Sequence, residues 1–238
     1  MTVDVILTAG DVAYDKVKNK NVAVVDVFRA TSVIVEALNN GARAVIPVVN
    51  VEDALLMQEK FRPGSVLLGG ERNTVMIDGF DLDNSPRMYK ASVVSGKTII
   101  FTTTNGTRAL YNAREAASVM VASFLNFSAV CAALARDGRD VAVICAGRND
   151  NFTAEDGLCA GAMVGVLALQ YGYEMTDIAE VMQNMYAMAA DDLRARLVTT
   201  THYRDISARG YDEDIRFCLQ RDIYDIVPVY SDKGEIVL

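Results

Sequence analysis

The sequence predicts an α/β fold: a single three-layer α/β/α domain over residues 1–238, built on a mixed, mostly parallel sheet. Two observations lead to this prediction. Short apolar runs alternate along the chain with segments of helical spacing. In three places an apolar run leads into a polar loop and then into the start of a helix. No linker or low-complexity stretch divides the chain.

The elements follow in order. The predicted strands cover residues 3–8, 22–25, 44–49, 66–68, 97–102, 118–122 and 140–145. The predicted helices cover residues 31–38, 51–61, 109–114, 153–171 and 177–197. Gly41 and the Arg62-Pro63-Gly64 break end the first two helices. Residues 227–238 are predicted to form a terminal hairpin, in which Pro228 confines its strand to an edge or a bulge.

Composition limits the function classes. The net charge is −8, and no basic run is present, so we expect no nucleic-acid partner. The N-terminus lacks a basic region before an apolar core, and the longest apolar run is shorter than the ~20 residues that span a bilayer, so we expect a cytoplasmic protein without membrane attachment. The four cysteines form no CxxC pair, which favours buried, reduced thiols.

The loop after residues 22–25 presents Asp26, Arg29, Thr31 and Ser32 at the start of a helix. A carboxylate, a guanidinium, two hydroxyls and free helix N–H groups can hold a phosphate and a divalent cation together. The alternative is structural, with Thr31 or Ser32 as an N-cap and Asp26 as a strand-end residue.

Other loops carry similar chemistry. Glu71 and Arg72 follow one strand, and Asp81 and Asp83 lie two residues apart in a later loop. Hard oxygen ligands of this kind suit Mg²⁺, although a cluster of Asx turns is the simpler explanation for the second pair. Residues 102–107, with Asn105, Gly106 and Thr107, have the composition of a phosphate-binding nest without the P-loop lysine. Glu155 and Asp156 open the long helix as part of a capping box or as metal ligands.

Several other classes are disfavoured. Arg148 follows Cys145 by three residues, which is too close for a thiol phosphatase loop. Phe28 stands where an aspartyl phosphatase has its second aspartate. No G-x-G-x-x-G follows a predicted strand, so a dinucleotide-binding fold is not expected. The single histidine, His202, is more simply explained as a structural residue. The methionines at helical spacing in residues 177–197 suit the core or a homodimer interface.

Taken together, these motifs resemble the 2-phosphosulfolactate phosphatase family across nearly the whole chain. The matching pieces are residues 25–31, 69–72, 79–81, 84–86, 103–107, 145–147 and 155–156, with His202, Cys218, Asp222 and Val227-Pro228 in the tail. Asn73, Asp83 and Tyr203 depart from it, because glycine is expected at each. The resemblance implies a Mg²⁺-dependent acid phosphatase that converts 2-phosphosulfolactate to 3-sulfolactate and phosphate, a step in coenzyme M biosynthesis.

The expected site follows from both lines of reasoning. Asp26, Arg29, Glu71 and Asp81 are the expected catalytic residues. The expected ligands of a small anionic phosphorylated substrate are Arg29, Thr31, Ser32, Arg72, Asn105, Gly106, Thr107 and Gly147. The expected Mg²⁺ ligands come from Asp26, Glu71, Asp81, Glu155 and Asp156. A non-catalytic binding module for a phosphorylated or sulfonated metabolite is the alternative, and attack by water or by Asp26 is left open.

Overall fold

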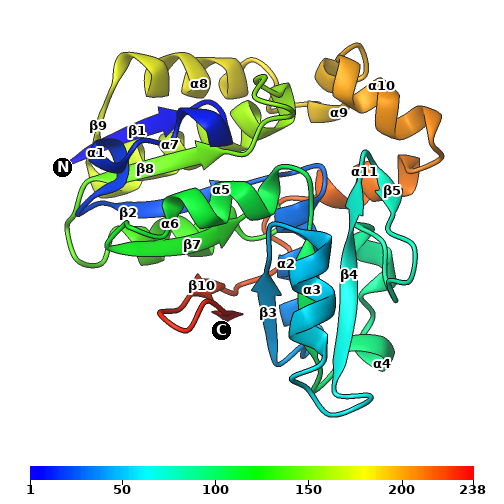
Figure 1. Cartoon of the computed structure of the whole chain (residues 1–238). Helices are drawn as coiled ribbons and strands as arrows, with labels where there is room; N and C mark the ends of the chain where they lie inside the picture. Colours follow the sequence, from blue (N-terminus) through cyan, green and yellow to red (C-terminus); the bar gives the residue numbers. More distant parts are fainter.

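The computed structural model describes residues 1–238 as an α/β fold with one sheet of eleven strands flanked by helices (Figure 1). The strands are β1 (Thr2–Ile6), β2 (Asn21–Val25), β3 (Ala44–Pro47), β4 (Val66–Arg72), β5 (Val75–Met76), β6 (Thr98–Thr102), β7 (Ser118–Ala122), β8 (Val141–Cys145), β9 (Glu174–Met175), β10 (Val229–Tyr230) and β11 (Ile236–Val237). The helices are α1 (Tyr14–Val17), α2 (Ala30–Asn39), α3 (Val51–Gln58), α4 (Ala91–Val94), α5 (Gly106–Ala113), α6 (Phe127–Leu134), α7 (Ala154–Tyr171), α8 (Asp177–Ala187), α9 (Leu193–Leu197), α10 (Thr201–Ala208) and α11 (Asp212–Cys218).

The strand order is β5-β4-β6-β3-β11-β10-β7-β2-β8-β1-β9. Two parallel portions are present, one from β7 to β9 and one from β3 to β4. The C-terminal hairpin of β10 and β11 lies between them and pairs antiparallel with both neighbours. The predicted mixed, mostly parallel sheet and the terminal hairpin are therefore confirmed, but the expected edge position of the strand at Pro228 is wrong, because β10 lies between β11 and β7 inside the sheet.

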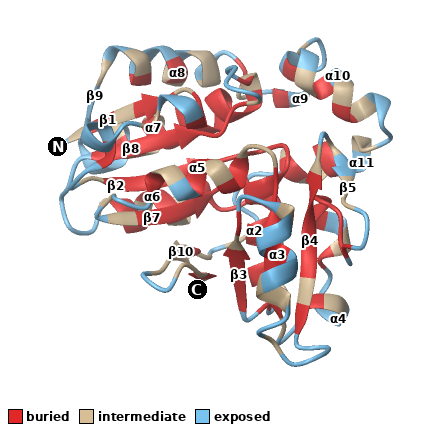
Figure 2. Cartoon of the chain, in the orientation of Figure 1, coloured by how far each residue is buried: buried red, intermediate tan, exposed pale blue.

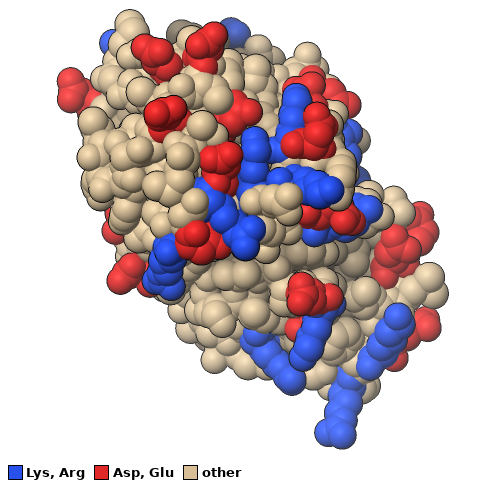
Figure 3. Space-filling view, turned by 90° about the vertical axis from the view of Figure 1, so that its left-hand side faces the viewer, with Lys and Arg blue, Asp and Glu red and all other residues tan.

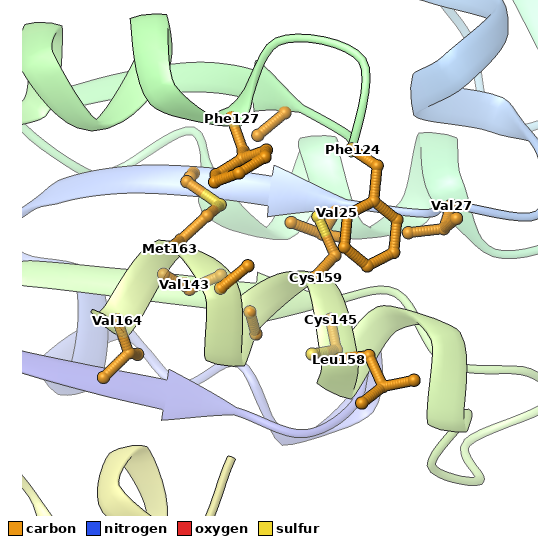
Figure 4. Packing of buried hydrophobic residues seen from close by; sticks show 14 of the residues in the cluster. Val25, Val27, Phe124, Phe127, Val143, Cys145, Leu158, Cys159, Met163 and Val164 are labelled. Carbon is orange, nitrogen blue, oxygen red and sulfur yellow. The ribbon is translucent and has the colours of Figure 1, made fainter. Parts of the chain in front are cut away.

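Alternation along the strands divides the apolar core between the two faces of the sheet. In β2, Ala23 and Val25 face α6 and α7, whereas Val22 and Val24 belong to a second cluster with α2 and α5. Figure 4 shows residues of α7, among them Leu158, Cys159 and Met163, packed against the strands. The strands are buried while the outer helix faces are exposed, which explains the continuous apolar runs of the parallel strands (Figure 2).

Two expectations about the chain are settled by these elements. Residues 177–197 were expected to form one helix, but α8 ends at Ala187 and α9 begins only at Leu193, where Asp192 caps it by accepting a hydrogen bond from the N–H of Ala195. All four cysteines are buried and unpaired, as expected.

None of the helices is long and apolar enough to cross a bilayer. On the face shown in Figure 3, positive and negative side chains lie interspersed.

Register places the polar loops together. Val25 of β2 pairs with Cys145 of β8, and Gly70 of β4 pairs with Thr102 of β6, so in each portion neighbouring strands end at the same level. The arrowheads of β2, β8 and β4 point towards the region of α10 and α11 (Figure 1). The loops that follow these strands therefore meet at the junction of the two parallel portions, under a cover supplied by the C-terminal helices.

Candidate active site

A polar pocket lies where the loops after β2, β4, β6 and β8 meet α10. Its lining residues are Asp26, Phe28, Arg29, Glu71, Asn73, Thr74, Asn84, Thr104, Asn105, Gly147, Arg148, Asn149, His202 and Ile206. Only Phe28 and Ile206 are hydrophobic, which is an unusual balance for a ligand pocket and suits a charged, hydrophilic ligand.

Two carboxylates face this pocket from opposite parallel portions of the sheet. Asp26 follows β2, and its Oδ1 accepts a hydrogen bond from the N–H of Ala30, the first residue of α2, at 3.3 Å. Glu71 is the next-to-last residue of strand β4. Its Oε1 accepts a hydrogen bond from the N–H of Thr104 at 2.8 Å, and its Oε2 accepts one from the N–H of Thr74 at 2.6 Å. Backbone donors thus fix both carboxylates.

Gly106 brings a second helix N-terminus to Asp26. A Cβ at this position would lie 2.7 Å from Asp26 Oδ2 and 2.6 Å from the Cβ of Ala30, so only glycine allows α5 to begin so close to α2. The positive ends of both helices therefore point at one carboxylate and favour negative charge there.

Three buried polar groups on the pocket wall have no protein partner. They are Arg29 Nη2, the side-chain oxygen of Asn84 and the hydroxyl of Thr104. Arg29 and Asn84 are 1% and 5% exposed, so leaving these groups unpaired is costly unless a ligand or water completes them. A guanidinium N–H and a hydroxyl are suitable donors for the oxygens of a phosphate or sulfonate, whereas the amide oxygen of Asn84 only accepts and suits a bound water, a protonated oxygen or a cation.

Asp156 holds two of the loops in place from behind the pocket. Its Oδ1 accepts from the N–H of Val27 at 2.8 Å, and its Oδ2 accepts from the N–H of Gly147 at 3.1 Å and from the Thr153 hydroxyl at 2.9 Å. Burial, with the nearby charge of Glu155, raises the pKa of Asp156 to about 7. Burial, followed by the charge of Asp156, also raises the pKa of Asp26 well above its usual range. A divalent cation beside Asp26 would relieve this accumulation of negative charge.

Comparison with known proteins identifies the family. The family model described as 2-phosphosulpholactate phosphatase matches residues 6–233. The chain belongs to the 2-phosphosulpholactate phosphatase family.

Relatives named "Probable 2-phosphosulfolactate phosphatase" agree with this assignment. The protein from Clostridium beijerinckii is 40% identical over 98% of both chains, and that from Clostridium acetobutylicum is 39% identical over 100% of both. The protein from Caldanaerobacter subterraneus subsp. tengcongensis is 44% identical over 89% of this chain and 88% of its own. The family name denotes a hydrolase of a phosphoric monoester.

In this family member the structure brings together five of the residues expected at the site. Asp26, Arg29, Glu71, Asn105 and Gly147 all line the pocket. Gly106 does not line it, but its backbone lies against the Asp26 carboxylate. The shared feature of these residues is their place just after a parallel strand, or at the end of one.

Four expected substrate ligands do not line the pocket, and their side chains bond elsewhere. The hydroxyls of Thr31, Ser32 and Thr107 are fully buried and donate to the carbonyl groups of Asp26, Val27 and Thr103. Each hydroxyl therefore closes its own loop. The guanidinium of Arg72 points away from the pocket and donates to the carbonyl of Val49 and to the Thr102 hydroxyl.

Of the expected Mg²⁺ ligands only Asp26 and Glu71 line the pocket, while Glu155 has an unpartnered Oε2 outside it. No group of three His, Cys, Asp or Glu side chains lies in an arrangement that could hold a metal ion. Asp81 is exposed and accepts from the N–H of Leu68, outside the pocket. Both Asp156 oxygens are occupied by protein donors, and Glu155 Oε1 contacts His202 Nδ1 at 2.5 Å. Asp26 and Glu71 remain as carboxylates that line the pocket.

Two carboxylates are enough for one kind of magnesium site. Mg²⁺ keeps several waters and is usually bound through one or two carboxylates plus the oxygens of a phosphorylated substrate. Asp26 and Glu71 therefore fit an ion that is shared with the substrate, although they do not form a complete cage by themselves.

Some pocket residues were not expected from the sequence. Asn84, Thr104, Arg148, Asn149 and His202 belong to this group. Asn84, Thr104 and His202 are all among the residues that carry the family resemblance, but polar residues in loops give no local signal of burial. Asn73, where glycine was expected, adopts a φ of +54°, a conformation that asparagine tolerates better than most residues.

Proposed function

We propose that this protein hydrolyses the phosphate monoester of 2-phosphosulfolactate to 3-sulfolactate and phosphate, with Mg²⁺ as its cofactor, as a step of the kind used in coenzyme M biosynthesis. The observation that carries the proposal is the meeting of three unpartnered polar groups, on Arg29, Asn84 and Thr104, with two carboxylates in one pocket. The family and the names of its relatives supply the substrate.

The charges in the pocket support catalysis over simple binding. A module that only binds an anion gains nothing from Asp26 and Glu71, because both repel a phosphate. If both carboxylates held a divalent cation, the resulting site would attract the phosphate. The ion supplies neutralisation of the charge that develops on the transferring phosphoryl group.

Each protein group then has a task. Asp26 and Glu71 would hold the ion, and their backbone donors fix the direction of each carboxylate. Arg29 Nη2 and the Thr104 hydroxyl would donate to the non-bridging oxygens of the phosphate, and the Asn84 oxygen would accept from a bound water. In the net reaction water supplies one oxygen to phosphorus, the bond to the ester oxygen breaks, and that oxygen leaves with a proton.

Cys145 does not take part as a nucleophile. It is fully buried and does not line the pocket, and burial raises the pKa of its thiol well above the usual range. A thiolate at this position is therefore disfavoured. Water or the Asp26 carboxylate remains as the attacking group.

The test is phosphate release from 2-phosphosulfolactate and from an aryl phosphate, with Mg²⁺ and with excess EDTA. We expect turnover with Mg²⁺, its loss in EDTA and its recovery when Mg²⁺ is restored. Full activity in EDTA would remove the metal from the proposal. Tight binding of either ester without phosphate release, under all metal conditions, would instead support the binding module.

A further inference from the structure

His202 is held against the pocket by a buried carboxylate. It lies in the first turn of α10 and lines the pocket, and its Nδ1 is 2.5 Å from Oε1 of Glu155. Glu155 lies in the first turn of α7, and its side chain is 1% exposed, against 15% for His202. The two residues are 47 positions apart, so the fold and not local sequence makes the pair.

The contact leaves one ring nitrogen free. A carboxylate only accepts, so Nδ1–H donates to Glu155, and Nε2 is the nitrogen that remains for another partner. The ring also packs edge-on against Phe28, with centroids 6.2 Å apart. Phe28 lines the same pocket and follows Asp26 by two residues. The imidazole is thus held on two sides, next to the loop that carries Asp26.

We propose that His202 is the general acid of the reaction and that Glu155 is its positioning residue; this inference rests on the proposed phosphatase function. In the step, the bond between phosphorus and the ester oxygen breaks, and the electron pair goes to that oxygen. The proton on Nε2 passes to the oxygen and completes the hydroxyl of the product. Solvent returns a proton to His202 before the next turnover.

A general acid speeds this reaction because the leaving group is an aliphatic alcohol. The ester oxygen of a 2-hydroxy acid is a poor leaving group as an alkoxide, and a positioned proton donor contributes roughly 10² to 10⁴-fold in rate. Glu155 fixes which ring nitrogen is left for the substrate, as a carboxylate does behind other catalytic imidazoles.

Other groups around the pocket are less suited to donate this proton. Both Glu71 oxygens accept backbone N–H bonds, so neither directs a proton into the pocket. Arginine does not release its proton in proteins, which excludes Arg29 and Arg148. The Tyr211 hydroxyl is engaged with Asp83 at 2.6 Å and does not line the pocket.

A purely structural pair is the competing explanation, because the contact also ties α10 to α7. The two explanations differ in how the protein responds to the leaving group. Removal of a general acid slows esters of weakly acidic alcohols more than esters of nitrophenol, whose anion leaves without a proton. Removal of a structural contact slows both alike.

The experiment compares His202→Asn, Glu155→Gln and wild type on 2-phosphosulfolactate and on 4-nitrophenyl phosphate, with saturating Mg²⁺. For His202→Asn we expect kcat on 2-phosphosulfolactate to fall roughly 10² to 10⁴-fold and the aryl ester to be much less affected. Glu155→Gln keeps an oxygen for Nδ1–H, so we expect a smaller loss in kcat with little change in KM. Arg204→Gln, on the same helix, is the matched control, since Arg204 is exposed, does not line the pocket and bonds to the carbonyl of Thr200.

A second measurement uses the natural ester alone. We expect the ¹⁸O isotope effect at the bridging oxygen, measured on kcat/KM, to be larger in His202→Asn than in wild type, because the oxygen then departs unprotonated. An unchanged isotope effect, or equal losses on both esters in a folded variant, would overturn the assignment. If His202→Asn does not fold, Glu155→Gln gives the same comparison. A wild-type protein that hydrolyses neither ester would refute the phosphatase function itself.

Discussion

Arg29 Nη1 donates to Asp214 Oδ2 at 2.7 Å, while Nη2 of the same guanidinium reaches the pocket without a protein partner. The Arg29 guanidinium also lies over the ring of Tyr211, 3.9 Å from the ring centre. Asp214 and Tyr211 both belong to the segment around α11, so the C-terminal part of the chain sets the direction of the fork. One half of the guanidinium thus has a buried carboxylate as its partner, while the other half has no partner within the protein.

Replacement of Arg29 by lysine keeps the positive charge but removes the planar guanidinium with its several N–H donors. Lysine can pair with Asp214 or with substrate, but a single ammonium does not span both as the guanidinium does. We expect kcat/KM to fall roughly 10² to 10³-fold in Arg29→Lys, in the range for loss of an electrostatic donor. Arg29→Ala should also lose about 3 to 5 kcal/mol of stability, because Asp214 stays buried without its partner.

Arg72→Lys is the matched control for this prediction, because Arg72 bonds to Val49 and Thr102 outside the pocket. We expect it to keep kcat/KM within a few-fold of wild type. Steady-state kinetics with thermal melting of each variant measures both effects. Near wild-type kinetics in a folded Arg29→Lys protein would take Arg29 out of the substrate site.

The carboxylates can be tested as a matched set. We expect Asp26→Asn and Glu71→Gln to lose at least roughly 10² in kcat and to bind Mg²⁺ more weakly, because each removes a charge beside the proposed ion. Asp81→Asn should retain both properties, since Asp81 is exposed and an amide oxygen can still accept from Leu68. Calorimetric titration with Mg²⁺ in the presence of inorganic phosphate measures the affinities. A loss at Asp81 equal to that at Glu71 would contradict the placement of the site.

Stability should decrease as the pH rises through the range in which Asp156 ionises. Burial and the charge of Glu155 raise the pKa of Asp156 to about 7, whereas an aspartate in the unfolded chain titrates near ~4. Between these values the folded protein holds a proton that the unfolded chain has released, so the free energy of unfolding falls with rising pH. The contribution is on the order of a few kcal/mol and is lost above about pH 7.

Urea unfolding of metal-free protein between pH 5 and pH 8 measures this slope. Asp156→Asn should be less stable in absolute terms, because its amide NH₂ group would face N–H or O–H groups that now donate to Asp156. The stability of this variant should nevertheless depend less on pH. An Asp156→Asn protein with the wild-type slope would show that other groups cause the pH dependence.

We predict opposite effects when two glycines are replaced by alanine. Gly106→Ala should disrupt the approach of α5 to α2 and displace Asp26, because the new Cβ would lie 2.6 Å from Ala30 Cβ and 2.7 Å from Asp26 Oδ2. We expect lower stability and a loss of kcat. Gly165→Ala in α7 has no atom nearer than 3.7 Å to the new Cβ, so we expect a gain of about 0.5 to 1 kcal/mol from helix propensity with unchanged kinetics. Melting curves and kinetics of the pair decide both statements.

Much of the fold could be predicted because its signals are local. The fully buried β2 is a continuous apolar run, and Asp26 follows it directly, so a strand, its end and a polar loop are all visible in one short stretch. The same reasoning found Glu71 and Asn105. It was wrong for residues 177–197, where a helical apolar stripe continues across a break between α8 and α9.

The site was harder to predict because the competing partners of each side chain come from elsewhere in the chain. Thr31 and Arg72 have the right chemistry for a phosphate, but the backbone of Asp26 and of Val49 takes their hydrogen bonds. His202 gave no signal of its own, since its partner Glu155 lies on another helix. Residue type and spacing indicate what a side chain can bind, whereas packing decides which partner it meets.

The hairpin between the two parallel portions makes the sheet weakest directly behind the site. Strand β10 pairs with β7 through Val229 and Met120 alone, and β11 pairs with β3 through Ile236 and Val45 alone. Asp26 and Glu71 stand on opposite sides of this seam. A rotation of a few degrees about it would alter the distance between the two carboxylates while both parallel portions stay intact. The apolar cluster that spans both portions, with α2 and α5, therefore acts as the brace that keeps the two carboxylates in register.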